Sequence, residues 1–332
     1  MRKLKEKSIQ GANERPKVVV ILGPTSSGKS ELAVELALNF NGEVVSADSR
    51  QVYRKLDISS SKVPGKWEWI GRKRFFVYKD VQHHMIDLVP LRKQYSAGQY
   101  RKKAKRAIQD ILERERLPIV AGGTGFYIDA LIHDLELPKV KPNSKLRKEL
   151  ENLSTDQLVH RLKALDPRRA SEIDTRNRRR LVRAIEVVVL TNSQIEPLQH
   201  DHENDPYESL RIGLKPSDEE LKRRISVVVE SRVKNGVVEE VRRTHRRGIG
   251  WQRIYNLGLE YKFIADHING KISLEEMAES MEKEYWHYIK RQMTWFKRDP
   301  DIIWIDDPEK ASPIVQDFLG LEDAPLPDRL EI

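Results

Sequence analysis

One octapeptide near the start of the chain constrains its fold more than any other feature. Residues 23–30 read GPTSSGKS and fit the pattern G-x-x-x-x-G-K-[ST]. A β-branched run at residues 17–22 precedes it, and residues 31–40 follow with apolar side chains at helical spacing. A strand, a glycine-rich loop and a helix in this order place backbone N–H groups around phosphate oxygens. The octapeptide therefore predicts a phosphate-binding loop in an α/β domain, and it leaves the reaction open.

Two more strand-like runs end in turns that carry polar residues. Residues 43–47 end at Asp48, and residues 119–121 end at the Gly-Gly-Thr of residues 122–124. Alternating strands and helices predict an α/β fold, with a mostly parallel sheet, helices on both faces and ligands beyond the carboxyl ends of the strands. We therefore expect the phosphate loop, Asp48 and Thr124 to meet at one site.

The domain organisation follows from the remaining pattern. A length of 332 residues predicts about two domains at roughly 150 residues each. Residues beyond 137 read as helices without a β-rich run, and strands return at 210–214 and 302–305, with charged helices between them. We expect a flexible tail at 1–16, a P-loop core at 17–136 and 207–310 with C-terminal helices, a helical insertion at 137–206, and a C-terminal tail at 311–332.

Composition narrows the partners. The chain has 60 Lys and Arg against 51 Asp and Glu, a formal net charge of +9, which favours a polyanionic partner. It has no cysteine, which excludes disulfides and thiolate catalysis and fits a reducing cytoplasm. No apolar run approaches the roughly 18 residues of a membrane span, so we expect no membrane partner.

Two clusters combine basic residues with other features. Arginines 176, 178, 179, 180 and 183 crowd one predicted helix start, where like charges four residues apart repel unless an anion relieves them. Residues 285–298 mix aromatic with basic side chains. Contacts with a nucleic acid explain both clusters. A solvated basic face explains the arginines equally well, and aromatic side chains at helical spacing more often form a buried core.

Four polar residues are candidates for chemistry. Lys29 adds a positive charge to the phosphate loop, and Ser30 can ligate Mg²⁺. Asp48 has three open roles: holding Mg²⁺ through water, accepting a proton or hydrogen bond from an acceptor substrate, or capping a turn. Thr124 follows two glycines, which permit close backbone approach, so its hydroxyl is expected to face the phosphates.

The combined motifs resemble those of bacterial tRNA dimethylallyltransferases, also called tRNA isopentenyltransferases. The resemblance runs from about residue 17 to about residue 306. Besides the phosphate loop, it rests on DSRQVY at 48–53, HHMID at 83–87, GGTGFY at 122–127, RAIEV at 183–187 and KRQMTW at 290–295. The order and spacing of these motifs are more specific than any one of them.

The resemblance implies a reaction. Such enzymes transfer a dimethylallyl group from dimethylallyl diphosphate to N6 of the adenosine just 3′ of the anticodon. It implies that Asp48 accepts the proton or hydrogen bond of the adenine amine, that Thr124 stabilises the leaving oxygen, and that Lys29 and Mg²⁺ on Ser30 take up charge. The implied diphosphate-binding residues are Gly23, Pro24, Thr25, Ser26, Ser27, Gly28, Lys29, Ser30 and Arg224.

The resemblance also implies a surface for the anticodon loop of tRNA, and the helical insertion becomes its tRNA-binding part. The partners are tRNA and dimethylallyl diphosphate, and the protein is expected to be a cytoplasmic monomer. The implied tRNA-binding residues are Asp48, Ser49, Arg50, Gln51, Arg179, Arg180, Arg183, Lys290, Arg291, Gln292, Trp295 and Lys297.

Some positions depart from the family pattern. Val228 stands where a second arginine usually follows Arg224, and Arg232 is a candidate replacement for it. Glu260 replaces a usual glycine. Residues 62–79, with two tryptophans, form an extra segment to which the pattern assigns no function.

Three alternatives stay open. One is a prenyltransferase of free adenine nucleotides, of the cytokinin type, against which stand the GGTG sequence at 122–125 and the basic insertion. Another is a P-loop small-molecule kinase, which consumes ATP without a prenyl donor. The last is an RNA-binding module that has kept the phosphate loop without turnover.

Overall fold

The computed structural model describes residues 15–197 and 204–321. The chain folds into two compact units, one formed by residues 1–134 with 202–332 and the other by Leu135–Asp201. The N-terminal tail expected at 1–16 lies outside the described residues up to residue 14, as does the end of the chain from residue 322. Each unit is described by itself below.

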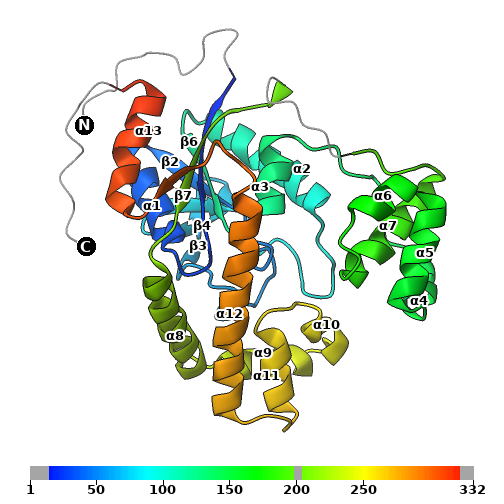
Figure 1. The fold of residues 1–332 in the computed structure, drawn as a ribbon. Helices are drawn as coiled ribbons and strands as arrows, with labels where there is room; N and C mark the ends of the chain where they lie inside the picture. Colours follow the sequence, from blue (N-terminus) through cyan, green and yellow to red (C-terminus); the bar gives the residue numbers. More distant parts are fainter. Residues whose placement is uncertain (1–14, 198–203, 322–332) are drawn as a thin grey trace. The chain divides into compact units, whose positions relative to one another are not determined.

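An eight-stranded sheet forms the centre of the first unit (Figure 1), with the strand order β3-β4-β5-β2-β6-β1-β7-β8. All neighbouring pairs are parallel except those of β4, which runs antiparallel to both of its neighbours. The strands are β1 (Lys17–Leu22), β2 (Gly42–Ser46), β3 (Lys66–Ile70), β4 (Lys73–Tyr78), β5 (Val81–His84), β6 (Leu117–Gly122), β7 (Glu208–Leu214) and β8 (Ile303–Ile305).

Helices cover both faces of this sheet because its central strands are apolar on both sides. Val18 and Val20 point into a core shared with α2 (Ala97–Leu112) and α3 (Gly125–Ile132). Val19 and Ile21 point into the opposite core, shared with α1 (Lys29–Asn39) and α13 (Ala311–Leu319). The side chains of these four β1 residues are fully buried. The predicted α/β fold with a mostly parallel sheet is confirmed.

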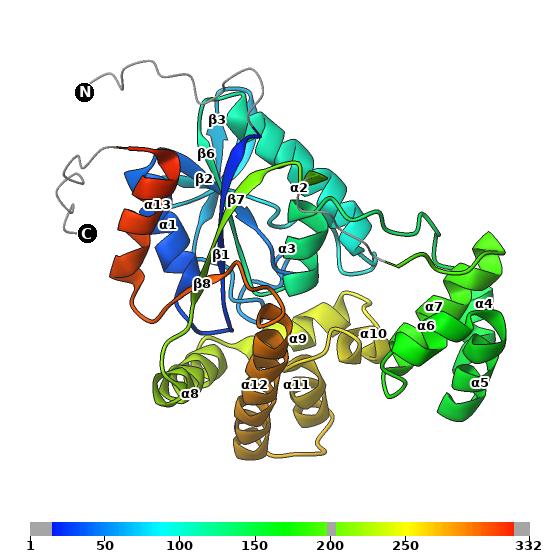
Figure 2. The ribbon, with the colours of Figure 1, turned by 45° about the horizontal axis from the view of Figure 1, so that its top comes forward.

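A third core joins the C-terminal helices to the segment after β2. Val52 and Leu56 are fully buried in it. Figure 2 shows these helices grouped together. They are α8 (Asp218–Lys234), α9 (Val237–Arg246), α10 (Trp251–Tyr255), α11 (Tyr261–Ile268) and α12 (Leu274–Phe296), and a short 3₁₀ helix, Pro308–Lys310, precedes α13.

The second unit is helical where it is described. Its helices are α4 (Ser144–Glu151), α5 (Thr155–Leu165), α6 (Pro167–Glu172) and α7 (Arg178–Thr191). They share a core in which Leu150, Leu158, Leu162 and Leu181 are fully buried. In neither unit does a described helix combine the length and apolarity needed to cross a membrane.

Two features of the first unit were not expected. Residues 311–319 were assigned to a C-terminal tail, and this was wrong, because they form α13 and bury Ala311 and Val315 completely. This short segment has Pro313 near its start, and its sequence pattern alone resembles that of a loop. Only the sheet face that it covers shows why it is a helix. The extra segment at 62–79 contains β3 and β4, which extend the sheet as a hairpin.

The α13 assignment yields the first prediction. Val315→Ala removes two buried methyl groups and leaves a cavity, so the free energy of unfolding should fall by about 2 kcal/mol. Urea unfolding of the full chain measures this loss. Asp317→Ala, at an exposed position of the same helix, is the control and should change the free energy by less than about 0.5 kcal/mol. Equal stability of the two variants would show that α13 does not pack on the sheet.

Candidate active site

The phosphate loop follows β1 and leads into α1. Gly23 and Gly28 have φ angles of 148° and 98°, which favour glycine. A Cβ on Gly23 would lie 2.4 Å from the carbonyl oxygen of Leu214, so a larger residue cannot fit there. No side chain caps the start of α1, which leaves its first N–H groups available to an anion. The Arg224 guanidinium donates to the carbonyl oxygen of Ser27 at 2.9 Å, and so α8 reaches the loop.

Lys29 lies inside this loop. Its Nζ donates to the carbonyl oxygen of Pro24 at 2.9 Å. Burial lowers the pKa of Lys29 to about 8, and the negative charge of Asp48 opposes that shift. The ammonium is therefore poorly solvated and near a carboxylate, and an anionic ligand in the loop would stabilise its charged form. Ser30, next in the chain, is half-buried in the first turn of α1.

Asp48 lies just after β2. Its Oδ1 accepts the backbone N–H of Arg50 at 2.7 Å and that of Gln51 at 3.4 Å, so this oxygen holds the turn. Its Oδ2 has no hydrogen bond among the described residues. Burial beside the Asp48 carboxylate raises the pKa of Tyr288 to about 12. Asp48 thus faces both Lys29 and the aromatic side of α12, with one oxygen holding the turn and the other available to a substrate.

Thr124 lies at the end of β6 and contacts the Asp48 segment. Its Oγ1 accepts the backbone N–H of Ser49 at 3.1 Å, and its own N–H donates to the carbonyl oxygen of Ala47 at 3.2 Å. A Cβ on Gly122 would lie 2.2 Å from that same carbonyl oxygen, so only glycine permits this approach. The structure therefore brings the ends of β2 and β6 together.

Gln292 of α12 connects β6 to the phosphate loop. Its Oε1 accepts the backbone N–H of Thr25 at 2.9 Å, and its Nε2 donates to the carbonyl oxygen of Gly123 at 2.8 Å. Its side chain is buried, and both of its amide atoms are bonded to protein. The sequence placed Gln292 among the tRNA contacts, and the structure instead makes it a bridge between two loops of the site.

Trp295 lies one turn further along α12 and packs on the start of α3. Its Nε1 donates to Oδ2 of Asp129 at 2.9 Å, and a Cβ on Gly125 would lie 2.2 Å from its ring. Burial raises the pKa of Asp129 to about 6, and the Trp295 hydrogen bond opposes that shift. Asp129 was not predicted from the sequence, because an aspartate inside an apolar helix has no motif of its own.

The basic side chains of α12 are exposed. Lys290 and Lys297 are open to solvent, and Lys290 Nζ lies 5.7 Å from the centroid of the Trp286 ring. Arg291 donates to Oε1 of Glu284 at 2.6 Å and lies over the Tyr288 ring. This helix therefore presents cations beside aromatic rings, a combination that suits RNA.

The arginines of the second unit divide into two groups. Arg179 and Arg180 are exposed at the start of α7, where Asn177 caps the helix. Arg183 donates to Oε2 of the fully buried Glu186 at 2.6 Å and to the carbonyl oxygen of Val140 at 3.0 Å. The Arg183 guanidinium thus already makes hydrogen bonds inside its own unit.

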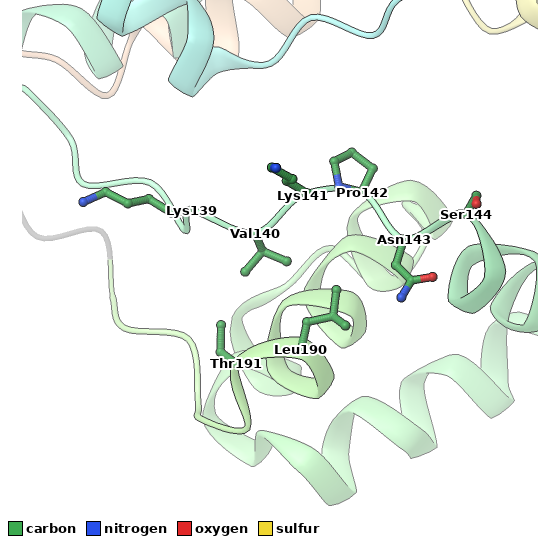
Figure 3. Close-up of a pocket in the computed structure, with 8 residues that line it drawn as sticks. All are labelled: Lys139, Val140, Lys141, Pro142, Asn143, Ser144, Leu190 and Thr191. Carbon is green, nitrogen blue, oxygen red and sulfur yellow. The ribbon is translucent and has the colours of Figure 1, made fainter.

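A pocket of the second unit lies beside this region (Figure 3). Residues 139–144 line it together with Leu190 and Thr191. Its lining contains two lysines and no carboxylate or histidine. It therefore lacks the groups for acid–base chemistry.

Arg232 and Glu260 form a buried ion pair in the first unit. Nη1 of Arg232 lies 2.9 Å from Oε1 of Glu260, and Nη2 donates to Oγ of Ser61. Their side chains are 7% and 2% exposed. Burial raises the pKa of Glu260, and Arg232 opposes that shift. Arg232, the candidate replacement for the second arginine, therefore contacts Glu260, which departs from the family pattern.

This pair determines what Arg232 does. It lies eight residues beyond Arg224 on α8, which is about 12 Å along a helix. Both of its guanidinium amines are bonded to protein, so its expected role as a second arginine at the diphosphate is not supported. Gln51 Nε2 donates to the carbonyl oxygen of Ser61 at 3.1 Å, and so the pair supports the Asp48 segment through Ser61.

The groups that could hold a metal are few. In the described ranges, no three His, Asp or Glu side chains gather to form a metal site. The hydroxyl of Ser30 at the start of α1 is one oxygen ligand that the loop offers. Mg²⁺ commonly takes one or two protein ligands and completes its shell with phosphate oxygens and water.

A parallel sheet with a phosphate loop after β1, and with two further strand ends beside that loop, defines a P-loop protein of the α/β class. A family model described as IPP transferase matches residues 51–299. The chain belongs to this family, and the resemblance drawn from its motifs is confirmed.

Individual relatives extend that result. A tRNA dimethylallyltransferase of Caldanaerobacter subterraneus is 38% identical over 300 residues, covering 87% of this chain and 92% of that protein. The crystal structure of a full-length tRNA isopentenylpyrophosphate transferase of Bacillus halodurans is 32% identical, with a TM-score of 0.64, and covers 92% of this chain and 95% of its own. A eukaryotic dimethylallyltransferase acting on tRNA is 25% identical, with a TM-score of 0.72 and coverage of 92% and 79%.

The buried ion pair yields a double-mutant prediction. Arg232→Met leaves the Glu260 carboxylate buried without its partner and should cost about 3–5 kcal/mol of unfolding free energy. The double variant Arg232→Met/Glu260→Leu should recover most of that loss, as urea unfolding will show. Arg223→Met breaks an exposed pair with Glu220 and serves as the control, with a loss below about 1 kcal/mol. If the loss of unfolding free energy in the double variant equals the sum of the losses in the two single variants, the pairing is contradicted.

Lys29 yields a prediction on pH. Its folded pKa of about 8 lies below the ordinary 10.5. Between these pH values the unfolded chain binds more protons, so this lysine makes stability rise with pH. Lys29→Met removes the buried charge and should be at least as stable as the wild type at pH 7.5. The stability of Lys29→Met relative to wild type should decrease from pH 8 to 10.5, as thermal unfolding will measure. The exposed Lys297→Met control should show no such trend, and parallel pH curves for all three proteins would contradict the assignment.

Proposed function

We propose that the protein transfers a dimethylallyl group from dimethylallyl diphosphate to N6 of the adenosine 3′ of the anticodon in tRNA and releases diphosphate. One observation carries the proposal. The Asp48 carboxylate and the Thr124 hydroxyl lie at neighbouring strand ends beside Lys29, and Gln292 joins those ends to the phosphate loop. The names of the relatives, which belong to tRNA dimethylallyltransferases, support the same reaction.

The donor fits the phosphate loop. The N–H groups at the start of α1, the Lys29 ammonium and the Arg224 guanidinium are positive groups that bind a diphosphate and stabilise its growing charge as it leaves. Ser30 would hold Mg²⁺ through its hydroxyl, with diphosphate oxygens as further ligands. When bound, the metal would neutralise part of the diphosphate charge. A carbon bonded to a well-stabilised diphosphate is a good electrophile.

The acceptor fits the Asp48 side. An exocyclic amine of adenine is a weak nucleophile, and it must lose one proton when it is alkylated. N6 attacks C1 of the allylic group, the bond between C1 and the diphosphate oxygen breaks, and the N6 proton passes to the free oxygen of Asp48 and then to water. The Thr124 Oγ1 accepts the Ser49 N–H at 3.1 Å, and its hydroxyl would donate a hydrogen bond to the leaving oxygen.

The tRNA fits the charged surfaces. Lys290, Arg291 and Lys297 on α12 would contact phosphates near the site, and Arg179 and Arg180 would do so from the second unit. Ser49, Arg50 and Gln51 follow Asp48 directly and would contact the nucleotides around the target base. We further propose that the enzyme acts as a monomer in the cytoplasm, where its tRNA substrate is available.

Asp48→Asn tests the role of the carboxylate. The amide keeps an oxygen that accepts the Arg50 N–H, but it cannot accept the N6 proton, so turnover should fall by about 10²- to 10⁴-fold. Affinity for dimethylallyl diphosphate should stay within about threefold of wild type. Mass spectrometry of digested tRNA measures the prenylated adenosine. Turnover close to that of wild type would remove Asp48 from the mechanism.

The same assay separates the alternatives. Wild-type protein is incubated with Mg²⁺ and dimethylallyl diphosphate, and either unmodified tRNA or AMP. Product on tRNA alone is the expected result, whereas product on AMP would identify a cytokinin-type enzyme. A parallel incubation with ATP and no prenyl donor tests the kinase alternative, because ATP consumption there would identify a kinase.

A further inference from the structure

The β3–β4 hairpin carries exposed tryptophans that the active site does not use. All five residues of β3 are exposed. Trp69 is 71% exposed, more than any other large apolar side chain in the described ranges, and Trp67 is 40% exposed. Trp69 pairs with Arg74 across the hairpin, and the Arg74 guanidinium lies 5.7 Å and 6.0 Å from the ring centroids of Trp67 and Trp69. These three side chains share one surface of the hairpin, named here the tryptophan face.

The hairpin is also strongly basic. Residues 62–79 contain six Lys or Arg residues, including Lys62 and Lys79 at the ends of the segment, and one acidic residue, Glu68. Three cations of the segment pair with carboxylates: Lys62 with Asp57 and Asp87, Lys73 with Asp110, and Lys79 with Glu31. Three others, Lys66, Arg72 and Arg74, have no carboxylate partner among the described residues. The tryptophan face is therefore bordered by uncompensated positive charge.

Hydrogen bonds connect this face to the Asp48 segment. The Trp67 Nε1 donates to Oδ2 of Asp87 at 3.4 Å. The Asp87 N–H in turn donates to the carbonyl oxygen of Gln51 at 3.0 Å. Phe76 pairs with His83 and Ile70 with Lys73, so β4 joins the hairpin to β5 in the main sheet. The tryptophan face is thus connected to the segment that follows Asp48.

We propose that the tryptophan face binds unpaired nucleotides of the tRNA substrate, with a base stacked on Trp69 and phosphates beside Arg72 and Arg74. Indole rings alternating with cations match a chain of bases and phosphates, and stacking on an exposed ring does not depend on sequence. The proposal rests on the proposed function, since it takes the RNA to be the substrate.

Other occupants fit this surface less well. The charged side chains of Lys66 and Glu68 on the edge strand disfavour the addition of a protein strand. A second copy of the chain would bring the same positive charge to the same surface. A polyanion with planar bases meets neither obstacle.

Trp69→Ala in the full-length protein tests the proposal. Loss of one base stack should weaken binding of unmodified tRNA about tenfold or more, while kcat at saturating tRNA stays near wild type and KM rises. Trp69→Phe keeps an aromatic ring and should restore most of the affinity. Ile70→Ala removes a neighbouring exposed apolar side chain, 42% exposed, and should leave affinity unchanged.

Arg72→Ala provides an independent measurement. Removing one phosphate contact should reduce the slope of log affinity against log salt by about 0.7–0.9. Affinity of Trp69→Ala equal to wild type, or an equal loss in Ile70→Ala, would overturn the proposal. So would a change of sedimentation from dimer to monomer in Trp69→Ala, because it would make the face a contact between copies.

The proposed function can fail separately. A wild-type protein that binds tRNA but forms no prenyladenosine would overturn the transferase reaction. If Trp69→Ala still weakened that binding, the tryptophan face would remain an RNA-binding surface.

Discussion

The amide of Gln292 is the contact on which the candidate active site depends. One side chain accepts a hydrogen bond from the phosphate loop at Thr25 and donates another to Gly123 beyond β6. Two strand ends far apart in sequence are thereby fixed to one helix. A buried amide left without either partner is costly, so the two loops can form their native contacts only when α12 is docked. The electrostatic groups that would stabilise a leaving diphosphate are therefore held in place before any substrate arrives.

The Asp48 segment depends on buried charge rather than on regular secondary structure. Glu240 of α9 accepts the backbone N–H groups of Asp57, Ile58 and Ser59 at 2.7, 2.9 and 3.1 Å. The Arg232–Glu260 pair binds Ser61 beside them. Residues after β2 thus form an irregular loop in which the Glu240 carboxylate of a C-terminal helix satisfies three backbone N–H groups. This explains how Asp48, which lies on a loop, can keep a defined position.

The elements that the sequence predicts well are those with a local signal. The phosphate loop, its flanking β1 and α1, and the returning strand β7 follow from periodicity and glycine spacing, and the motifs place Asp48 and Thr124 at strand ends. The bridging role of Gln292 was not predicted, because only its distant partners at Thr25 and Gly123 reveal it. The Arg232–Glu260 pair joins residues 28 apart, and nothing local in either helix reveals it. α13 was missed because nine residues with a proline near the start have too little periodicity to distinguish a helix from a tail.

Net charge favours a polyanionic partner, but burial decides which basic residues can contribute to binding it. Arg147 and Arg183 both pair with the buried Glu186, and Arg114 pairs with the buried Glu43. These arginines count toward the formal +9 but hold the protein's own carboxylates. The cations left for phosphates are those without such partners, including Lys290 and Lys297 on α12 and Lys66 and Arg72 on the hairpin. Because each phosphate contact contributes to the salt dependence of binding, the salt slope measures this smaller set rather than the formal charge.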